Sequence, residues 1–204
     1  MNTFTVLTKN YTLPPIDKDE VFRYMGCKSE NCEINSLFSS VKNELRDKTV
    51  GKVCYAIFDI KLYDGYLDLG FATTHSKDLS KNLDGCDSII LFAATVGLEF
   101  DKMILKLGKS SPSAALCIDA IGNERIEALC DMFCKDIENS VSLSNQALRP
   151  RFSAGYGDLP IELQRDIFNT LSPHTKIGLT LNDSLLMSPA KSVSAIVGIN
   201  KQQV

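Results

Sequence analysis

The chain has 204 residues, which is long enough for one sizeable domain and short for two. Its hydrophobic fraction of 44% and charged fraction of 23% are those of an ordinary globular protein. The net charge of −3 gives no electrostatic reason to expect nucleic acid or an anionic membrane as a partner. No apolar run is long enough to cross a bilayer, and residues 1–5 lack the features of a secretory signal, so we expect a cytoplasmic protein.

The first elements predicted along the chain are two helices and a strand. Helices are expected near residues 17–25 and 33–46, the second because apolar residues recur there at helical spacing. Residues 52–62 then change to the alternation of a strand. One face of that strand carries Cys54, Ala56, Phe58 and Ile60.

The middle of the sequence predicts a hairpin, a buried strand and more helices. Asp64-Gly65 is a strong tight-turn signal, which pairs the preceding strand with residues 66–72. A short helix is expected at 77–83. Residues 88–94 are almost continuously apolar, which indicates a central strand buried on both faces. Two further helices are predicted, over residues 98–107 and 113–141.

Near the end of the chain, Asp158 is expected to be the N-cap of a helix over residues 160–171. Residues 177–181 and 192–199 are predicted to be strands. Because helices and strands are segregated along the chain, we predict an α+β fold with a largely antiparallel twisted sheet flanked by helices. We expect a single domain over residues 1–204, with a helical N-terminal part at about 1–48.

The cysteines and histidines do not form a recognisable chemical motif. Seven cysteines, an odd number, argue against a disulfide framework, and none has Cys-x-x-Cys spacing. With His75 and His174 as the two histidines, both in polar stretches, we expect no metal site and interpret the cysteines as small buried hydrophobes. A glycine-rich phosphate loop and a Gly-x-Ser-x-Gly elbow are both absent from the sequence, so a nucleotide cradle or a hydrolytic triad is not indicated.

The strongest binding motif is Arg151-Phe152-Ser153-Ala154-Gly155-Tyr156-Gly157-Asp158. Arginine offers a rigid fork of donors that suits a carboxylate. Glycines let the backbone approach a ligand closely and adopt dihedrals that other residues avoid. A tyrosine held on such a turn can direct its hydroxyl at a ligand. The segment therefore predicts a binding site.

This motif fits an Arg-x-x-x-Gly-Tyr pattern, and Leu181-Asn182-Asp183-Ser184 follows thirty residues later. Together they resemble the activation domain of cobalamin-dependent methionine synthase. The resemblance is strongest over residues 151–199 and weaker upstream, over 86–98 and along the helix that carries Glu127. The chain resembles a free-standing form of this domain, because no cobalamin-, folate- or homocysteine-binding module accompanies it.

The resemblance implies a methyltransferase component with an S-adenosylmethionine-binding core over about residues 50–200. In this family the domain supplies the methyl group when cobalt has been oxidised to Co(II), and a flavodoxin-like or other reductase supplies one electron. Here the cobalamin would be carried by methionine synthase modules in trans. The alternative is a non-catalytic module that senses S-adenosylmethionine or acts as a chaperone for a corrinoid protein.

The resemblance also implies roles for individual residues. Arg151 would bind the ligand carboxylate and Glu127 its ammonium or ribose. Backbone contacts would come from the segment Phe152, Ser153, Ala154 and Gly155. Tyr156 would be the catalytic residue, reaching the upper face of cobalt through the axial water and helping to release that ligand.

Each assignment has a structural alternative. Arg151 could instead form an ion pair with a helix carboxylate, Glu127 could be a solvated helix residue, and Tyr156 could pack under the following helix. Asp183 stands where the family has Glu and either contacts ligand or supports its loop. Lys191 could face corrin or partner acids, or be solvated.

Overall fold

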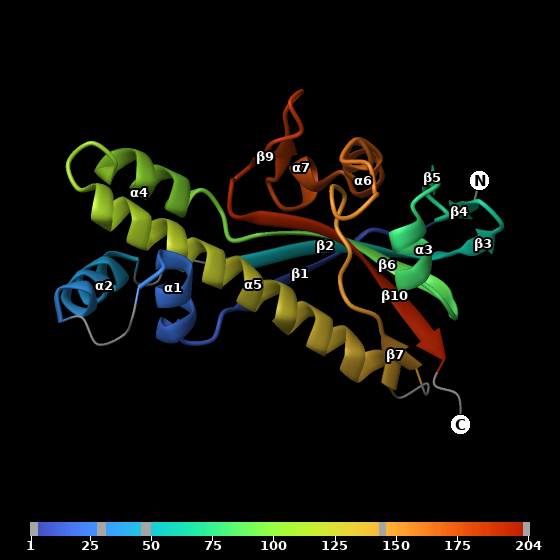
Figure 1. The fold of residues 1–204 in the computed structure, drawn as a ribbon, viewed down its shortest axis with the longest axis horizontal. Helices are drawn as coiled ribbons and strands as arrows, with labels where there is room; N and C mark the ends of the chain where they lie inside the picture. Colours follow the sequence, from blue (N-terminus) through green and yellow to red (C-terminus); the bar gives the residue numbers. More distant parts are fainter. Residues whose placement is uncertain (1–3, 28–31, 46–49, 143–145, 202–204) are drawn as a thin grey trace.

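The computed structural model describes residues 4–27, 32–45, 50–142 and 146–201. These residues form a five-stranded sheet in which all neighbouring strands are antiparallel (Figure 1). In spatial order its strands are β1 (Leu7–Thr12), β2 (Val50–Asp59), β6 (Cys86–Thr95), β10 (Ser192–Lys201) and β7 (Gln146–Leu148). The α+β class with a largely antiparallel sheet flanked by helices is confirmed.

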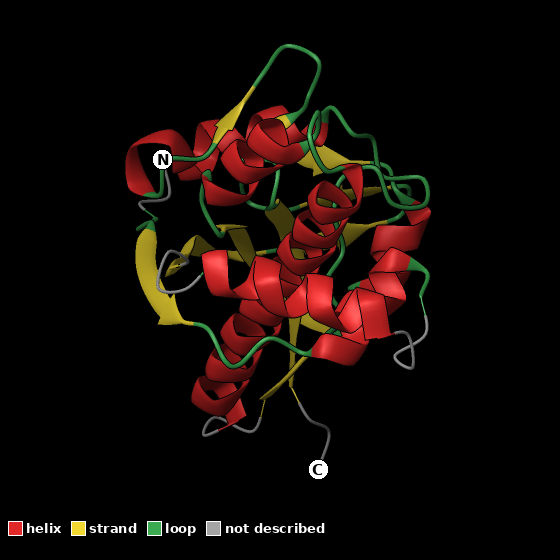
Figure 2. Cartoon of the chain, turned by 90° about the vertical axis from the view of Figure 1, so that its left-hand side faces the viewer, coloured by secondary structure: helices red, strands yellow, loops and turns green. Residues whose placement is uncertain are grey.

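Helices cover both faces of this sheet. One face packs against α1 (Lys18–Met25), α2 (Cys32–Glu44), α4 (Glu99–Leu107) and α5 (Pro112–Ser142). The other face packs against α3 (Lys77–Asn82) and α6 (Leu163–Leu171), with the short α7 (Pro173–Lys176) following α6. Seen from the end where α2 and α4 lie, helices stand in front of the central strands (Figure 2).

The central strand β6 is shared by two hydrophobic cores. Alternate side chains of an extended strand point to opposite faces, and both sets on β6 are buried. The set that faces α5 is Ile90, Phe92 and Ala94, and the set that faces α6 is Ile89, Leu91 and Ala93. The prediction of a strand buried on both sides is therefore confirmed.

The long helix α5 agrees closely with its predicted range of 113–141. It runs along the sheet in Figure 1. The apolar residues that recur at helical spacing along it are all buried: Ala114, Ile118, Ile121, Leu129, Phe133 and Ile137. The amphipathic pattern of the sequence thus identifies the face of α5 that covers the sheet.

The N-terminal part differs from the expected helical segment over about residues 1–48. Residues Leu7–Thr12 form β1, an edge strand paired with β2, before α1 and α2 follow. Asp17 is the N-cap of α1, and its side chain accepts from the backbone N–H groups of Asp19 and Glu20. The strand was missed because its polar composition does not mark it as part of a sheet.

The predicted hairpin exists, but its strands are shorter than expected. The predicted strand over 52–62 is divided at Ile60, whose N–H donates to the carbonyl of Asp87 at 3.0 Å. A separate small sheet contains β3 (Lys61–Tyr63), β4 (Tyr66–Asp68) and β5 (Thr73–Thr74). Gly65 makes the turn between β3 and β4 with φ of +91°, where glycine is favoured.

Two predictions for the C-terminal part are wrong. The helix expected over 160–171 begins at Leu163, and Asp158 is not its N-cap. Residues 177–181 are not one strand, because Ile177 is the C-cap of α7. The strand β8 is limited to Thr180–Leu181, and it pairs with β9 (Met187–Ser188).

Three further findings concern the described residues as a set. None of their helices has both the length and the apolar character required to cross a membrane. Within the same residues, no group of three or more His, Cys, Asp or Glu side chains is arranged to hold a metal ion. Four cysteines are buried: Cys54, Cys86, Cys117 and Cys130.

Candidate functional site

The segment that carries the binding motif is attached to β10. After β7, the N–H of Arg149 donates to the carbonyl of Gly198 at 2.8 Å. Phe152 then exchanges two backbone hydrogen bonds with Ile196, at 2.9 Å and 2.8 Å. Arg151 is therefore held between two attachment points on the edge of the main sheet.

The side chain of Arg151 forms two ion pairs with α5. Its Nη2 donates to Oε2 of Glu127 at 3.0 Å and to Oδ1 of Asp131 at 2.9 Å. The structure thus brings together Arg151 and Glu127, both named from the sequence. It also shows the structural alternative for Arg151, an ion pair with a helix carboxylate.

Asp131 is a site residue that sequence reasoning missed. It lies four residues after Glu127, and residues with this spacing are neighbours on one face of a helix. This spacing was the signal that could have identified it. The two carboxylates give α5 a local negative charge directly opposite the guanidinium.

Partial burial and nearby charges shift the pKa of Arg151 in opposite directions. Burial disfavours its charged form, but Cys130, Glu127 and Asp131 outweigh this and hold the pKa of Arg151 above its ordinary value. Beside it, burial raises the pKa of the Cys130 thiol to about 12. Arg151 therefore remains a cation, and Cys130 remains a neutral thiol at neutral pH.

The loop after Arg151 is closed by its own backbone. The N–H of Gly155 donates to the carbonyl of Leu159 at 2.9 Å, and the N–H of Tyr156 donates to that of Ser153 at 3.1 Å. Ala154 is buried beneath the loop. Since the N–H groups of Phe152 and Gly155 are already bonded, those of Ser153 and Ala154 are the better candidates for ligand contacts along this segment.

Tyr156 points away from the core, with 61% of the residue exposed. Its ring lies edge-on to that of Phe152, with centroids 6.3 Å apart. Both rings line a shallow hollow of about 740 Å³. The other lining residues are Gly155 and Gly157 from the loop and Asp78, Lys81 and Asn82 from α3. Tyr156 therefore does not pack under the following helix, and it faces α3 whereas Arg151 faces α5.

Asp158 fixes the far end of the loop to α3. Its carboxylate accepts from the N–H groups of Lys77 at 2.8 Å and Asp78 at 3.2 Å, and from the hydroxyl of Ser76. Hydrogen bonds from Ser76 and from the Lys77 N–H hold the pKa of Asp158 below its ordinary value. Asp158 thus acts at the N-terminus of a helix eighty residues upstream, where a negative charge is favourable.

Asp183 lies in the turn between β8 and β9. Its carbonyl oxygen accepts from Nη2 of Arg165 on α6 at 2.8 Å, and the side chain of Asn182 accepts from the N–H of Leu186 at 2.9 Å. The Arg165 bond joins the turn to α6, and the Asn182 bond closes the turn itself. The structure thus places Asp183 with α6, rather than with Arg151 and Glu127.

Lys191 is neither a solvated lysine nor one that faces outward, contrary to both alternatives taken from the sequence. The residue is buried, and its Nζ donates to Oδ1 of Asp119 and Oδ1 of Asn123, each at 2.7 Å. It therefore joins the residue before β10 to α5.

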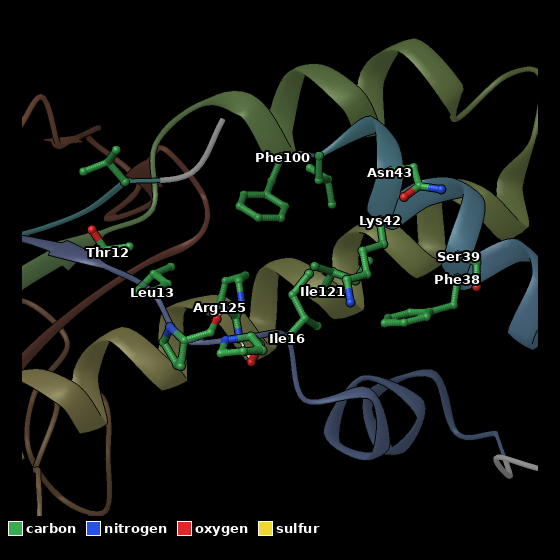
Figure 3. Close-up of a pocket in the computed structure, with 14 residues that line it drawn as sticks. Thr12, Leu13, Ile16, Phe38, Ser39, Lys42, Asn43, Phe100, Ile121 and Arg125 are labelled. Carbon is green, nitrogen blue, oxygen red and sulfur yellow. Dashed lines mark hydrogen bonds between the residues drawn. The ribbon is translucent and has the colours of Figure 1, made fainter. Parts of the chain in front are cut away.

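A second cavity of about 680 Å³ lies between α2, α4, α5 and residues 12–16 (Figure 3). At its inner wall Phe100, Ile121 and Arg125 are 0%, 0% and 3% exposed. The guanidinium of Arg125 bonds to Glu124 and to the carbonyls of Pro14 and Pro15. Glu124 and Arg125 both belong to α5, and the bonds from Arg125 to the two proline carbonyls join the N-terminal segment to this helix.

Comparison by sequence finds no matching family profile and no matching curated protein. Among solved structures, the chain is similar to the crystal structure of the MetH reactivation domain bound to AdoHcy. The TM-score is 0.70 at 14% sequence identity, and the match covers 98% of this chain and 80% of that chain. The chain therefore has the fold of the MetH reactivation domain.

Proposed function

We propose that this protein binds S-adenosylmethionine at Arg151 and presents its methyl group for reductive methylation of cob(II)alamin carried by a partner protein. It would thereby act as the reactivation component of a cobalamin-dependent methionine synthase. The structural neighbour binds AdoHcy, the thioether that remains after S-adenosylmethionine gives up its methyl group. This supports a ligand of the same chemical class here.

The observation that carries the proposal is the pairing of Arg151 with Glu127 beside the loop 152–157. The ligand ends in an α-amino acid, which has one carboxylate and one ammonium group close together. Arg151 supplies a cation and Glu127 a carboxylate 3.0 Å away, and both are partly exposed. The two side chains match the two charges of the ligand, and charge-assisted hydrogen bonds of this kind are the strong ones.

The protein itself positions the methyl donor and performs no nucleophilic step. The methyl group would pass from the sulfonium to cobalt on the partner, after one-electron reduction by a flavodoxin-like or other donor, and the thioether would remain. Tyr156 is suited to meet the partner because its hydroxyl is on an exposed ring at the loop tip. There its hydroxyl would offer a hydrogen bond to the corrinoid that the partner presents, and the cobalt of that group would accept the methyl group.

A second candidate function is a non-catalytic module that binds S-adenosylmethionine or a corrinoid protein. The different directions of Arg151 and Tyr156 favour it, since Arg151 turns toward α5 and Tyr156 toward the hollow beside α3. The position of Asp183 against α6 also favours it. In this case the ligand would bind without delivering its methyl group.

One experiment separates the two functions. Calorimetric titration of the full chain with S-adenosylmethionine tests binding, and methyl-labelled ligand is then supplied with a Co(II) corrinoid partner and a reductant. Labelled methylcobalamin is the result expected for the proposed reactivation function. Binding without transfer in the presence of an active reductant and a competent partner supports the non-catalytic module. If the ligand does not bind, the reactivation function is wrong, and binding to a corrinoid protein is the part of the second candidate that stays open.

A further inference from the structure

A single nitrogen of Arg151 makes both of its ion-pair contacts with α5. Nη2 carries two hydrogens, one bonded to Glu127 and the other to Asp131. A guanidinium binds a carboxylate through two parallel N–H groups, either Nε with Nη2 or Nη1 with Nη2. Both two-point arrangements need a hydrogen of Nη2. A ligand carboxylate must therefore displace one of the two helix carboxylates before it can bind in this way.

We infer that Asp131 competes with the ligand carboxylate for Arg151, so that binding breaks the Arg151–Asp131 pair and keeps the Arg151–Glu127 pair. The inference rests on the proposed function and adds to it a residue that sets the affinity of the site. Asp131 is thus a positioning residue, which acts on the ligand through Arg151.

The exposure of the two carboxylates decides which of them is displaced. The side chain of Asp131 is 73% exposed and that of Glu127 is 45% exposed. Displaced Asp131 regains water more easily, because it has lost less of its hydration in the ion pair. Glu127 has more to lose by leaving the guanidinium, and so it remains between Arg151 and the ligand ammonium.

The inference predicts that removing Asp131 strengthens binding. Exposed ion pairs contribute up to about 1 kcal/mol, so Asp131→Ala is expected to raise the affinity for S-adenosylmethionine about two- to fivefold. The matched control is Glu138→Ala, which removes an exposed carboxylate from the same helix two turns further on. It changes the net charge equally but leaves Arg151 untouched, so we expect unchanged affinity.

A second ligand tests the competition directly. Decarboxylated S-adenosylmethionine lacks the carboxylate that would bind Nη2 of Arg151. The Asp131→Ala variant and the wild type should therefore bind it equally. Calorimetric titration of the full chain with both ligands gives the four affinities. A gain restricted to the carboxylate-bearing ligand supports the inference.

The outcomes that contradict the inference differ from the outcome that contradicts the proposed function. If the wild type binds S-adenosylmethionine and Asp131→Ala binds it equally or more weakly, the competition is wrong while the proposed function stands. If Asp131→Ala strengthens binding of both ligands equally, or Glu138→Ala gives the same gain, the effect is general electrostatics and the inference is overturned. If the wild type and all variants fail to bind, the proposed function is wrong, and the inference with it.

Discussion

The side chain of Lys191 lies across Gly122 of α5. A Cβ at Gly122 would come within 2.8, 2.9 and 3.0 Å of Cε, Cγ and Cδ of the lysine. These distances leave no room for a methyl group unless the whole lysine stem moves. The glycine therefore leaves room for the lysine side chain to pass over α5 and bond to Asp119 and Asn123.

We expect Gly122→Ala to destabilise the protein, even though alanine is favoured over glycine in a helix by about 1 kcal/mol. Overpacking costs about 1–3 kcal/mol, and moving the lysine also strains two charged hydrogen bonds. The net loss should be about 1–2 kcal/mol in the free energy of unfolding, measured in urea. Adding Lys191→Ala should make Gly122→Ala harmless or favourable. A Gly122→Ala variant that is more stable than the wild type would contradict the packing argument.

Arg151→Ala is expected to weaken binding of S-adenosylmethionine by about 1.5–3 kcal/mol, the scale of a lost hydrogen bond to a charged group. Calorimetry measures the change. Arg165→Ala is the matched control, because it removes an arginine that bonds to the carbonyl of Asp183 and should leave the affinity unchanged. Unchanged affinity in Arg151→Ala would leave Arg151 as a structural partner of α5.

Tyr156→Phe should bind S-adenosylmethionine nearly as well as the wild type but transfer its methyl group more slowly. The variant removes the hydroxyl and keeps the ring against Phe152. The measurement is the rate of labelled methyl transfer to the corrinoid partner. Because the ring is largely exposed, the thermal midpoint should stay the same. A large drop in that midpoint would indicate that the hydroxyl is structural.

Gly157→Ala is expected to disturb the loop that carries Tyr156. Gly157 has φ of +52°, and a Cβ there would clash with Oδ2 of Asp78. Gly178→Ala is the matched control, since Gly178 has φ of +74° with nothing within 4 Å of its Cβ position. The control should cost about 1–2 kcal/mol from backbone strain, and Gly157→Ala should cost more. Equal unfolding free energies for the two variants would show that the loop and α3 can separate freely.

The contact between β1 and α5 predicts a dependence of stability on pH. Asp136 accepts from Lys9 at 2.7 Å and from Tyr11 at 2.8 Å, and these bonds hold its pKa below the ordinary 3.8. The folded state therefore gains stability above pH 3.8, and this gain is lost as the pH falls below that value. Asp136→Asn should be less stable than the wild type at pH 7 and closer to it near pH 3, in urea denaturation at both pH values. A difference that does not change with pH would contradict this role of the carboxylate.

The parts of the fold predicted best are those with a strong local pattern. Apolar residues recur at helical spacing along the whole of α5, and β6 is a continuous apolar run. Because both patterns indicate burial by themselves, the predicted ranges of these two elements lie close to the observed ones. The strand β1 has a polar sequence and becomes a strand through pairing with β2. The capping role of Asp158 depends on residues eighty positions away. Sequence patterns contain no signal for such distant partners.

The candidate site shows the same difference between local sequence patterns and contacts with distant residues. The motif identified Arg151 and Tyr156 as residues of interest, and the resemblance to the activation domain added Glu127. Their directions came from the fold, because the attachment of Phe152 to Ile196 and of Asp158 to α3 decides which side of the loop each side chain faces. Asp131 was within reach of sequence reasoning, since it repeats the carboxylate of Glu127 one helical turn later.

The two hydrogen bonds between Phe152 and Ile196 make the main chain beside Arg151 an extension of the sheet. A receptor built on such a fixed edge does not need to order a mobile segment when its ligand arrives, so little conformational entropy is lost on association. Conformational change on binding is then confined to side-chain rotamers. We expect the backbone beside Arg151 to have the same conformation with and without S-adenosylmethionine.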